Sequence, residues 1–480
     1  MRTHVIARYT GLALMLNALF MLLSVGVSLL HRDAALVPLL VSAAVTGVVG
    51  FSAFVLSRQE VEINMREGYL IVVLGWVMSC TFGMLPYLLY GGEFSLANAW
   101  FESVSGYTTT GATILSNVEA LPKGLLFWRS STTWVGGVGV VVFTLLVLPS
   151  MGSAKMRLSR MQVGALKHEE AKYSMQQIVR IILSVYVGIT VTLTLLLWIA
   201  GMSFFDAINH AFSTAATGGF SVKNASIMAY ESPLIEGILI AFMIISSLNF
   251  GLLYVAFAKK FTTLLNSSVV RYFVASLAVG ALLITINLVQ MGVYDSWLRA
   301  LRDAAFQVVA MASTTGFAAS SNAAWPAFSV LISFFFMLQC GCIGSTSGGI
   351  KADRVLIFYK AFVANVRKTL HPNAVIPVRL RGVALDEELV SATTLFIALY
   401  MATFFATALL LLFTGLDLLT GLSAAAAALG NVGPGFGEIY SLGNHSAFSG
   451  AAKTICSIAM LLGRLEIYGL LIIFYYRYWR

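Results

Sequence analysis

Ten apolar segments, each close to or above 20 residues in length, constrain the fold of this chain more than any other feature. A helix needs about 20 apolar residues to cross the hydrocarbon core of a bilayer. The composition agrees, because 59% of the 480 residues are apolar, 11% are charged and the mean hydropathy is +0.86. We therefore expect an all-α integral membrane protein with ten transmembrane helices, at residues 9–30, 34–57, 68–91, 132–152, 181–201, 237–257, 272–292, 326–350, 389–415 and 454–476.

The basic residues orient these spans. Arg2 and Arg8 precede the first segment, as in a signal peptide, but its uncharged run exceeds the apolar region of about 7 to 15 residues typical of such peptides, so we interpret it as a retained helix. With the N-terminus inside, most of the 30 Lys and Arg residues fall in inner loops, as is usual for cytoplasmic loops. We expect both termini in the cytoplasm. The net charge of +9 then reflects topology rather than nucleic-acid binding.

After the first two segments, one pattern occurs four times: an apolar span, a shorter apolar piece, a polar turn with glycine, and a second apolar span. The turns read SVSGYTTTGAT (103–113), FSTAATGGFS (212–221), MASTTGFAAS (311–320) and LGNVGPGFG (429–437). One glycine in each aligns, roughly 100 residues from the next: Gly111, Gly218, Gly316 and Gly433. Internal repeats of this kind point to the transport site in membrane transporters.

The short pieces before the turns, such as residues 96–105 and 303–313, are too short to cross a bilayer but suit half-helices that enter from one face. Irregular backbone at that depth is tolerated only where it is buried in protein or lines a water-filled cavity. Four such turns imply four span, half-helix, span units in pseudo-fourfold symmetry around one pore. By the topology above, every half-helix enters from the outside.

The turns suit a monovalent cation. Backbone carbonyls replace the water around such an ion, and glycine supplies the unusual dihedrals that an extended loop needs. No ring of Asp or Glu is visible, which argues against a divalent-cation site. A single turn of this kind is more often a site of close helix packing, but four at matched positions favour a filter. We predict that potassium binds at Thr109, Thr110, Gly111, Ala216, Thr217, Gly218, Thr314, Thr315, Gly316, Asn431, Val432 and Gly433.

These motifs, with GCIGSTSGGIK (341–351) and LLGRLEIY (461–468), resemble the Trk/Ktr/HKT superfamily of potassium transporters over nearly the whole chain. The two extra N-terminal spans are similar to the bacterial TrkH-type pore-forming subunit. The resemblance implies a homodimer and a cytosolic, TrkA-like, nucleotide-binding regulatory partner. The second turn departs from the pattern, because Val222 and Lys223 stand where a Thr and a His are expected.

The glycine-rich stretch at 341–349 interrupts an apolar span. A phosphate-binding loop is excluded, because that motif needs Gly-Lys-Ser/Thr in direct succession after a strand. A packing cluster is the plainer alternative, although seven small residues within nine are dense enough to break a helix. The resemblance implies an intramembrane gate below the filter, formed by Gly344, Ser345, Thr346, Ser347, Gly348, Gly349 and Lys351.

Three ionisable residues lie within apolar segments. Arg464 falls within the final span, where an unpaired charge is costly, so we expect it to face the pore cavity near the glycine-rich loop and to contribute to gating, with a structural tie between helices as the alternative. Glu102 either attracts cations or bonds to nearby backbone. His210 is either a pH sensor or, as we favour, a structural histidine.

The chain then divides into two extra spans (1–67), unit 1 (68–153), unit 2 (154–257), unit 3 (258–350), a cytoplasmic connection (351–388) and unit 4 (389–480). The basic loops at 155–172 and 351–381 either dock the partner or only fix topology. The function we expect is potassium uptake across the inner membrane. The alternatives are a secondary carrier of a small organic solute, which usually has a twofold repeat, and a membrane enzyme, for which no catalytic cluster is visible.

Overall fold

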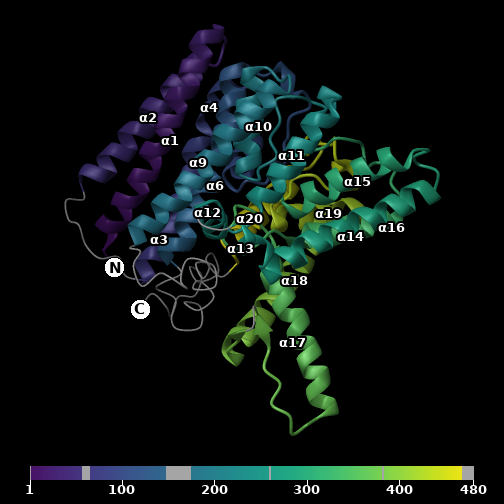
Figure 1. Ribbon diagram of the computed structural model, residues 1–480. Coiled ribbons are helices and arrows are strands. Elements are labelled where there is room, and N and C mark those ends of the chain that lie inside the picture. The colour runs from purple at the N-terminus through teal and green to yellow at the C-terminus, as the bar shows by residue number, and fades with distance from the viewer. Residues whose placement is uncertain (1, 57–64, 148–174, 259–260, 381–382, 468–480) are drawn as a thin grey trace.

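The computed structural model describes residues 2–56, 65–147, 175–258, 261–380 and 383–467, most of which are helical (Figure 1). Six of the described helices are long and apolar enough to cross a membrane. The number is seven if α11 (Pro233–Ser246) and α12 (Phe250–Ala258), which are bent against each other, count as one span. The chain is therefore a largely helical membrane protein. The expected ten spans also include shorter helices, which length and composition alone do not identify as spans.

The two N-terminal helices form a hairpin beside the rest of the molecule. These helices, α1 (Thr3–His31) and α2 (Leu36–Val55), pack closely together, and α1 also contacts α3 (Met65–Gly83) and α6 (Lys123–Val147). A Cβ atom at Gly11 would lie 2.6 Å from the carbonyl oxygen of Gly50, so small residues permit the close approach. Outward-facing side chains are apolar, as at Val48, which is 69% exposed, and this surface suits lipid.

Four units follow, each with a first helix, a short helix and a second helix. The first helices are α3 continued by α4 (Leu85–Tyr90), α9 (Met175–Ile199), α14 (Ser268–Gln290) and α18 (Glu387–Phe413). The short helices are α5 (Leu96–Tyr107), α10 (Phe204–Ala215), α15 (Trp297–Ala312) and α19 (Leu418–Gly430). The second helices are α6, α11 with α12, α16 (Ala327–Leu338) and α20 (Gly450–Arg464). The minor helices are η1 (Val118–Ala120), η3 (Ser226–Tyr230), α13 (Thr262–Leu265) and η4 (Gly437–Ile439).

The short helices connect neighbouring units. Each contacts both helices of its own unit and also the second helix of the preceding unit. Thus α10 contacts α6, α15 contacts α11, and α19 contacts α16. The first short helix, α5, contacts α20 of the last unit. The contacts therefore run from each unit to the next and return from the fourth to the first.

Three of the second spans are interrupted. α16 ends at Leu338, as the dense glycines predict, and the chain continues through β1 (Gln339–Cys340), the glycine-rich segment and β2 (Ile350–Lys351), which pairs in parallel with β1. Two breaks were not expected from the sequence. The span expected at 237–257 bends by 106° between α11 and α12. The helix expected at 454–476 ends early, because α20 ends at Arg464 and the second and third residues beyond it, Glu466 and Ile467, have left-handed φ values of 54° and 59°.

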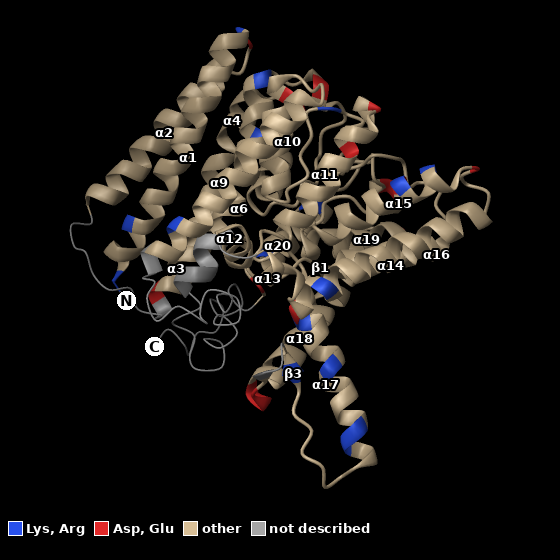
Figure 2. Cartoon of the chain, viewed as in Figure 1, with Lys and Arg blue, Asp and Glu red and all other residues tan. Residues whose placement is uncertain are grey.

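The connection between units 3 and 4 extends away from the other helices. It consists of α17 (Ala352–Leu370) and an antiparallel hairpin of β3 (Arg379–Leu380) and β4 (Val383–Ala384) (Figure 1). Lys and Arg residues lie along α17, whereas the helices of the body carry few charges (Figure 2). The other basic loop expected from the sequence, at 155–172, lies outside the described residues.

Candidate functional site

The four short helices end in the same backbone motif. The first or second residue after each helix has a left-handed φ between 53° and 61°, and its amide donates to the carbonyl three residues back. In three of the four, the next amide donates to the carbonyl five residues back, which completes a Schellman motif. The left-handed residues are Thr109, Thr217, Thr314 and Asn431. We number the turns that follow as turn 1 (108–113), turn 2 (216–221), turn 3 (313–318) and turn 4 (430–435).

Three of the left-handed residues are threonines, whose branched side chains disfavour this conformation. Such a residue costs on the order of 1 to 3 kcal/mol and persists only where the surroundings fix it. Here the surroundings do so, because Thr109, Thr217 and Thr314 are fully buried. The shape of the turns is therefore imposed by packing and not by local preference.

Side chains cap the opposite ends of three of the four short helices, α5, α10 and α19. The hydroxyls of Ser95 and Ser203 accept hydrogen bonds from amides in the first turns of α5 and α10. At α19 the carboxylate of Asp417 accepts from the amide of Thr420 at 3.1 Å. Hydrogen bonding with Thr420 lowers the pKa of this carboxyl, and its negative charge suits a helix N-terminus. Both ends of these helices are thus fixed, and their C-terminal ends lead into the turns.

One glycine in each turn lies against one carbonyl oxygen of the next turn. These contacts are so close that a Cβ atom at the glycine would overlap with the oxygen. In order, Gly111, Gly219, Gly316 and Gly433 meet the carbonyl oxygens of Gly218, Thr315, Val432 and Thr110. The sequence of contacts closes, because turn 4 returns to turn 1. Four carbonyls at equivalent positions are therefore brought together, one from each turn.

The structure corrects the alignment of turn 2 by one residue. The aligned glycines at Gly111, Gly316 and Gly433 have left-handed φ values of 78°, 69° and 96°. In turn 2 the left-handed glycine is Gly219, with φ of 70°, and Gly218 is not among the left-handed residues. The equivalent triplet in turn 2 is therefore 217–219 and not 216–218. Two adjacent glycines made the sequence alignment ambiguous at this point.

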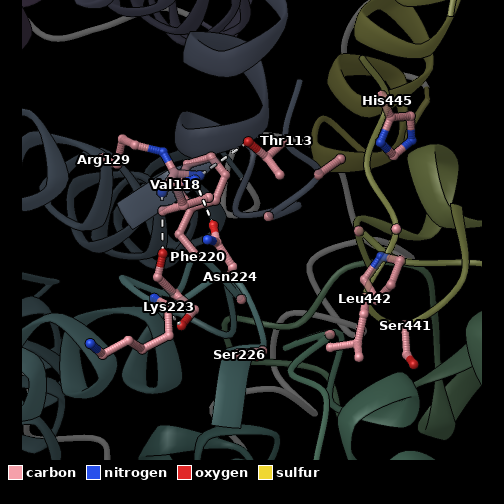
Figure 3. A pocket seen from close by; sticks show the side chains of 18 residues that line it. Thr113, Val118, Arg129, Phe220, Lys223, Asn224, Ser226, Ser441, Leu442 and His445 are labelled. Carbon is pink, nitrogen blue, oxygen red and sulfur yellow. Dashed lines mark hydrogen bonds between the residues drawn. The ribbon is translucent and has the colours of Figure 1, made fainter. Parts of the chain in front are cut away.

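A cavity of about 80 Å³ opens beside these glycines (Figure 3). All four left-handed glycines line it, together with side chains that include Arg129, Lys223 and His445. Around this cavity, the segments that follow neighbouring turns are hydrogen-bonded to each other. Val118 N donates to Asn224 Oδ1 at 2.7 Å between units 1 and 2, and His445 N donates to the carbonyl of Thr113 at 2.8 Å between units 4 and 1.

The glycine-rich segment at 341–349 lies against the other side of the turns. Thr346 Oγ1 donates to the carbonyl of Ala215 at the end of α10, at 3.1 Å. Gly348 N donates to Thr314 Oγ1 of turn 3, also at 3.1 Å, and a Cβ atom at Gly348 would overlap with the carbonyl oxygen of Gly430 at the end of α19. The segment therefore contacts the half-helix ends or turns of units 2, 3 and 4.

Two buried basic side chains, those of Lys351 and Arg464, hold the glycine-rich segment. Lys351 Nζ donates to the carbonyl and the hydroxyl of Ser347. Arg464, which is 4% exposed, donates through Nη1 to the carbonyl of Thr346 at 2.7 Å and through Nη2 to the carbonyl of Gly136 in α6 at 3.3 Å. Arg464 therefore lies beside the glycine-rich segment, as expected, but at the end of α20 and not within a continuous span. The neighbouring carboxylate of Glu466 pairs instead with Arg354, at 2.7 Å.

The two other ionisable residues are bonded within the protein. Glu102 pairs with Arg129 at 2.8 Å and is fully buried, so it is not an exposed cation attractor. His210 contacts the carbonyl of Asp206 at 2.8 Å and the hydroxyl of Ser221 at 3.0 Å, which fits the structural role that we favoured.

Sequence reasoning missed Asn249, at the break between α11 and α12. Its side-chain amide donates to the carbonyl of Ile343 at 2.9 Å, and Phe250 N donates to the carbonyl of Gly344 at 3.1 Å. Cys342 N donates in the opposite direction, to the carbonyl of Ser247 at 2.8 Å. The break in unit 2 and the glycine-rich segment of unit 3 therefore satisfy each other's backbone groups. Two serines and an asparagine in an apolar span (246–249) were the available signal.

Comparisons with known proteins agree in family. Residues 39–479 match the model of a family described as TrkH, cation transport protein. The chain is 35% identical to the Trk system potassium uptake protein TrkH of Salmonella typhimurium and, equally, of Escherichia coli K12, over 100% of each chain. The crystal structure of the potassium transporter TrkH from Vibrio parahaemolyticus superposes with a TM-score of 0.91, at 34% identity and complete coverage of both chains.

Proposed function

Because the chain belongs to the TrkH family of cation transport proteins, we propose that it carries potassium into the cell through a selectivity filter formed by its four turns. It is a Trk-type potassium transporter subunit and not an enzyme. The relatives named for potassium uptake do not favour the alternative, a carrier of organic solutes.

One observation supports the filter above all others: the carbonyls of Thr110, Gly218, Thr315 and Val432 occupy equivalent positions and each lies against the preceding turn. A ring of carbonyl dipoles at fixed distances replaces the hydration shell of a monovalent cation without adding net charge. In addition, the C-terminal ends of four half-helices, which carry partial negative charge, lead into these turns. The filter residues are then the predicted ones, with the triplet of turn 2 moved to Thr217, Gly218 and Gly219.

The same proposal places the four units in pseudo-fourfold symmetry about one pore, with ten spans in total and the two N-terminal helices outside the ring. The boundaries are those drawn from the sequence: 1–67, 68–153, 154–257, 258–350, 351–388 and 389–480. The cyclic contacts between the short helices and the preceding second helices support this arrangement. The excess of basic residues in inner loops supports cytoplasmic termini in the inner membrane.

We further propose that the glycine-rich segment gates the pore below the filter. It contacts half-helix ends or turns of units 2, 3 and 4 and is tied through Arg464 to α6 of unit 1, and these contacts support a position across the path that leads from the turns. Gly344, Ser345, Thr346, Ser347, Gly348 and Gly349 form the segment that moves. Lys351 and Arg464 hold it closed by donating to its carbonyls.

Shortening this segment tests the gate. Deletion of residues 345–348 leaves the β1 and β2 pairing at its base and removes the contacts to Ala215 and Thr314. We expect uptake to rise at least about tenfold, which corresponds to a barrier lowered by about 1.4 kcal/mol. Rubidium uptake into liposomes measures this, with the melting temperature as a control. A packing role instead predicts slower uptake together with a lower melting temperature.

For partners, we propose a homodimer and a cytosolic nucleotide-binding regulatory subunit. The Lys and Arg residues along α17 (Figure 2) make this helix, with the hairpin that follows it, a candidate cytoplasmic attachment site. No role for nucleic acid is proposed, since the basic residues follow the membrane topology.

Growth of a strain that lacks its own potassium uptake systems tests the function as a whole. We expect the chain, expressed with the host's cytosolic subunit, to restore growth at low potassium and to support rubidium uptake. A panel of labelled organic solutes, measured in the same cells, should show no gain. Uptake of a solute without any uptake of rubidium would contradict the proposal.

A further inference from the structure

We propose that Glu102 and Arg129 form a specificity-determining clamp that fixes turn 1 against turn 2 from behind the filter. The inference rests on the proposed filter and adds to it two residues that lie outside the ring of carbonyls. Both side chains are buried, with 0% and 2% of their side-chain surface exposed. Other ion pairs, such as Lys223 with Glu119 and Arg302 with Glu236, keep at least one partner a third or more exposed.

The guanidinium of Arg129 holds equivalent positions in two neighbouring turns (Figure 3). Nη1 donates to the carbonyl of Ser221 at 3.2 Å, and Nη2 donates to Thr113 Oγ1 at 3.3 Å. Thr113 lies two residues after Gly111, and Ser221 lies two residues after Gly219. The guanidinium also lies over the ring of Phe220, with its Cζ atom 4.1 Å from the ring centre. One planar group therefore sets the separation of the two turns just beyond the filter glycines.

Glu102 holds Arg129 and turn 1 at the same time. Arg129 Nε donates to Glu102 Oε1 at 2.8 Å. The hydroxyl of Thr113 lies 3.0 Å and 3.1 Å from the two carboxylate oxygens, and the amide of Ile114 donates to Oε2 at 3.0 Å. Because Glu102 is on α5, the carboxylate links the half-helix of unit 1 to the segment that leaves its own turn. A fork of this geometry needs arginine, since lysine presents a single point charge.

The clamp crosses the boundary between turns 1 and 2, and this boundary is part of the carbonyl ring. Gly111 of turn 1 lies against the carbonyl oxygen of Gly218 in turn 2, so a small change in the separation of the two turns moves that oxygen. Discrimination between potassium and sodium depends on the positions and number of such oxygens. The pair is also balanced in charge beside the cavity that Arg129 lines, so loss of either partner leaves a net charge next to the ion path.

Four variants separate geometry from charge. Arg129→Lys keeps the charge and loses the fork, and we expect the ratio of potassium to sodium uptake to fall at least about fivefold, or about 1 kcal/mol. Glu102→Gln leaves a positive charge and should raise the KM for potassium. The double variant Glu102→Gln/Arg129→Gln removes both charges and should restore the KM but not the ratio. Thr113→Val removes the hydroxyl of turn 1 that both clamp residues contact, and it should lower the ratio without any change in charge.

Glu119→Gln is the matched control. Glu119 also lies at the boundary between units 1 and 2, where it accepts from the amide of Asn224 at 3.0 Å, but it is exposed and lies outside the clamp. We expect this variant to keep the wild-type ratio. Uptake ratios are measured in liposomes with rubidium and sodium tracers, and melting temperatures are measured on the same samples.

The outcomes distinguish this inference from the proposed function. If the wild-type protein does not discriminate between potassium and sodium, the filter itself is wrong. If the wild type discriminates and Arg129→Lys and Thr113→Val keep its ratio while melting at lower temperature, the pair is only structural and the clamp is overturned.

Discussion

Replacing Gly219 with alanine should abolish most of the discrimination between potassium and sodium. The residue has a φ of 70°, and an added Cβ atom would overlap with the carbonyl oxygen of Thr315. The left-handed conformation alone costs an alanine roughly 1 to 2 kcal/mol, and the overlap forces a ring oxygen to move. We expect the ratio of potassium to sodium uptake to fall at least about tenfold, or about 1.4 kcal/mol. Tracer uptake into liposomes measures this ratio.

Two controls accompany this variant. Gly92 has a similar φ of 67° but no heavy atom within 4 Å of an added Cβ, so Gly92→Ala tests dihedral strain without overlap and should keep the ratio. Gly218→Ala tests the register of turn 2, because its Cβ would meet the side chain of Thr133 and its φ is not left-handed. We expect a smaller loss than at Gly219. An equal or larger loss at Gly218 would instead support the alignment of Gly218 with Gly111, Gly316 and Gly433 that the sequence suggested.

Replacing Arg464 with methionine should speed uptake several-fold. The arginine places a fixed positive charge beside the glycine-rich segment and donates to the carbonyl of Thr346 at 2.7 Å. Methionine keeps much of the volume, removes the charge and releases the segment, so both the repulsion of entering cations and the restraint on the gate are lost. Electrical recording from planar bilayers also detects the change in voltage dependence that loss of a pore charge predicts.

Arg354→Met is the control for loss of a buried arginine. Arg354 is 4% exposed, pairs with Glu466 at 2.7 Å and lies over the ring of Phe396, with its Cζ atom 3.9 Å from the ring centre. We expect this variant to melt at a lower temperature without faster uptake. If Arg464→Met behaves in the same way, then Arg464 is a structural tie between helices and not part of the gate.

Much of the fold follows from the sequence because hydrophobic length and repetition are strong signals. Most long helices lie close to their expected ranges, as for α14 (Ser268–Gln290) against 272–292, although α6 begins at Lys123 and not at 132, and the short helices precede each turn. The breaks at Ser247 and after Arg464 were missed, because a span is recognised by its apolar length, and a few polar residues do not reduce that length enough. The break between α11 and α12 is stabilised by distant partners, because the carbonyl of Gly344 accepts from the amide of Phe250, whereas after Arg464 the amides of Glu466 and Ile467 bond within the last turn of α20, to the carbonyls of Gly463 and Leu462.

The site was predictable in outline but not in register. Glycine and threonine mark all four turns, yet the sequence cannot distinguish Gly218 from Gly219, since the choice depends on which one adopts a left-handed φ. The role of Glu102 was equally undetermined, because its partner, Arg129, lies on another helix. Arg464 was found from the cost of an unpaired charge in a membrane, which is a general constraint and needs no knowledge of the fold.

Anomalous diffraction from crystals grown in rubidium chloride tests the filter most directly, because rubidium substitutes for potassium and scatters anomalously. The filter predicts an anomalous peak on the axis between the carbonyl oxygens of Thr110, Gly218, Thr315 and Val432. It also predicts that this peak is lost in crystals of Gly219→Ala. A rubidium peak elsewhere in the protein, with none between these four oxygens, would contradict the account.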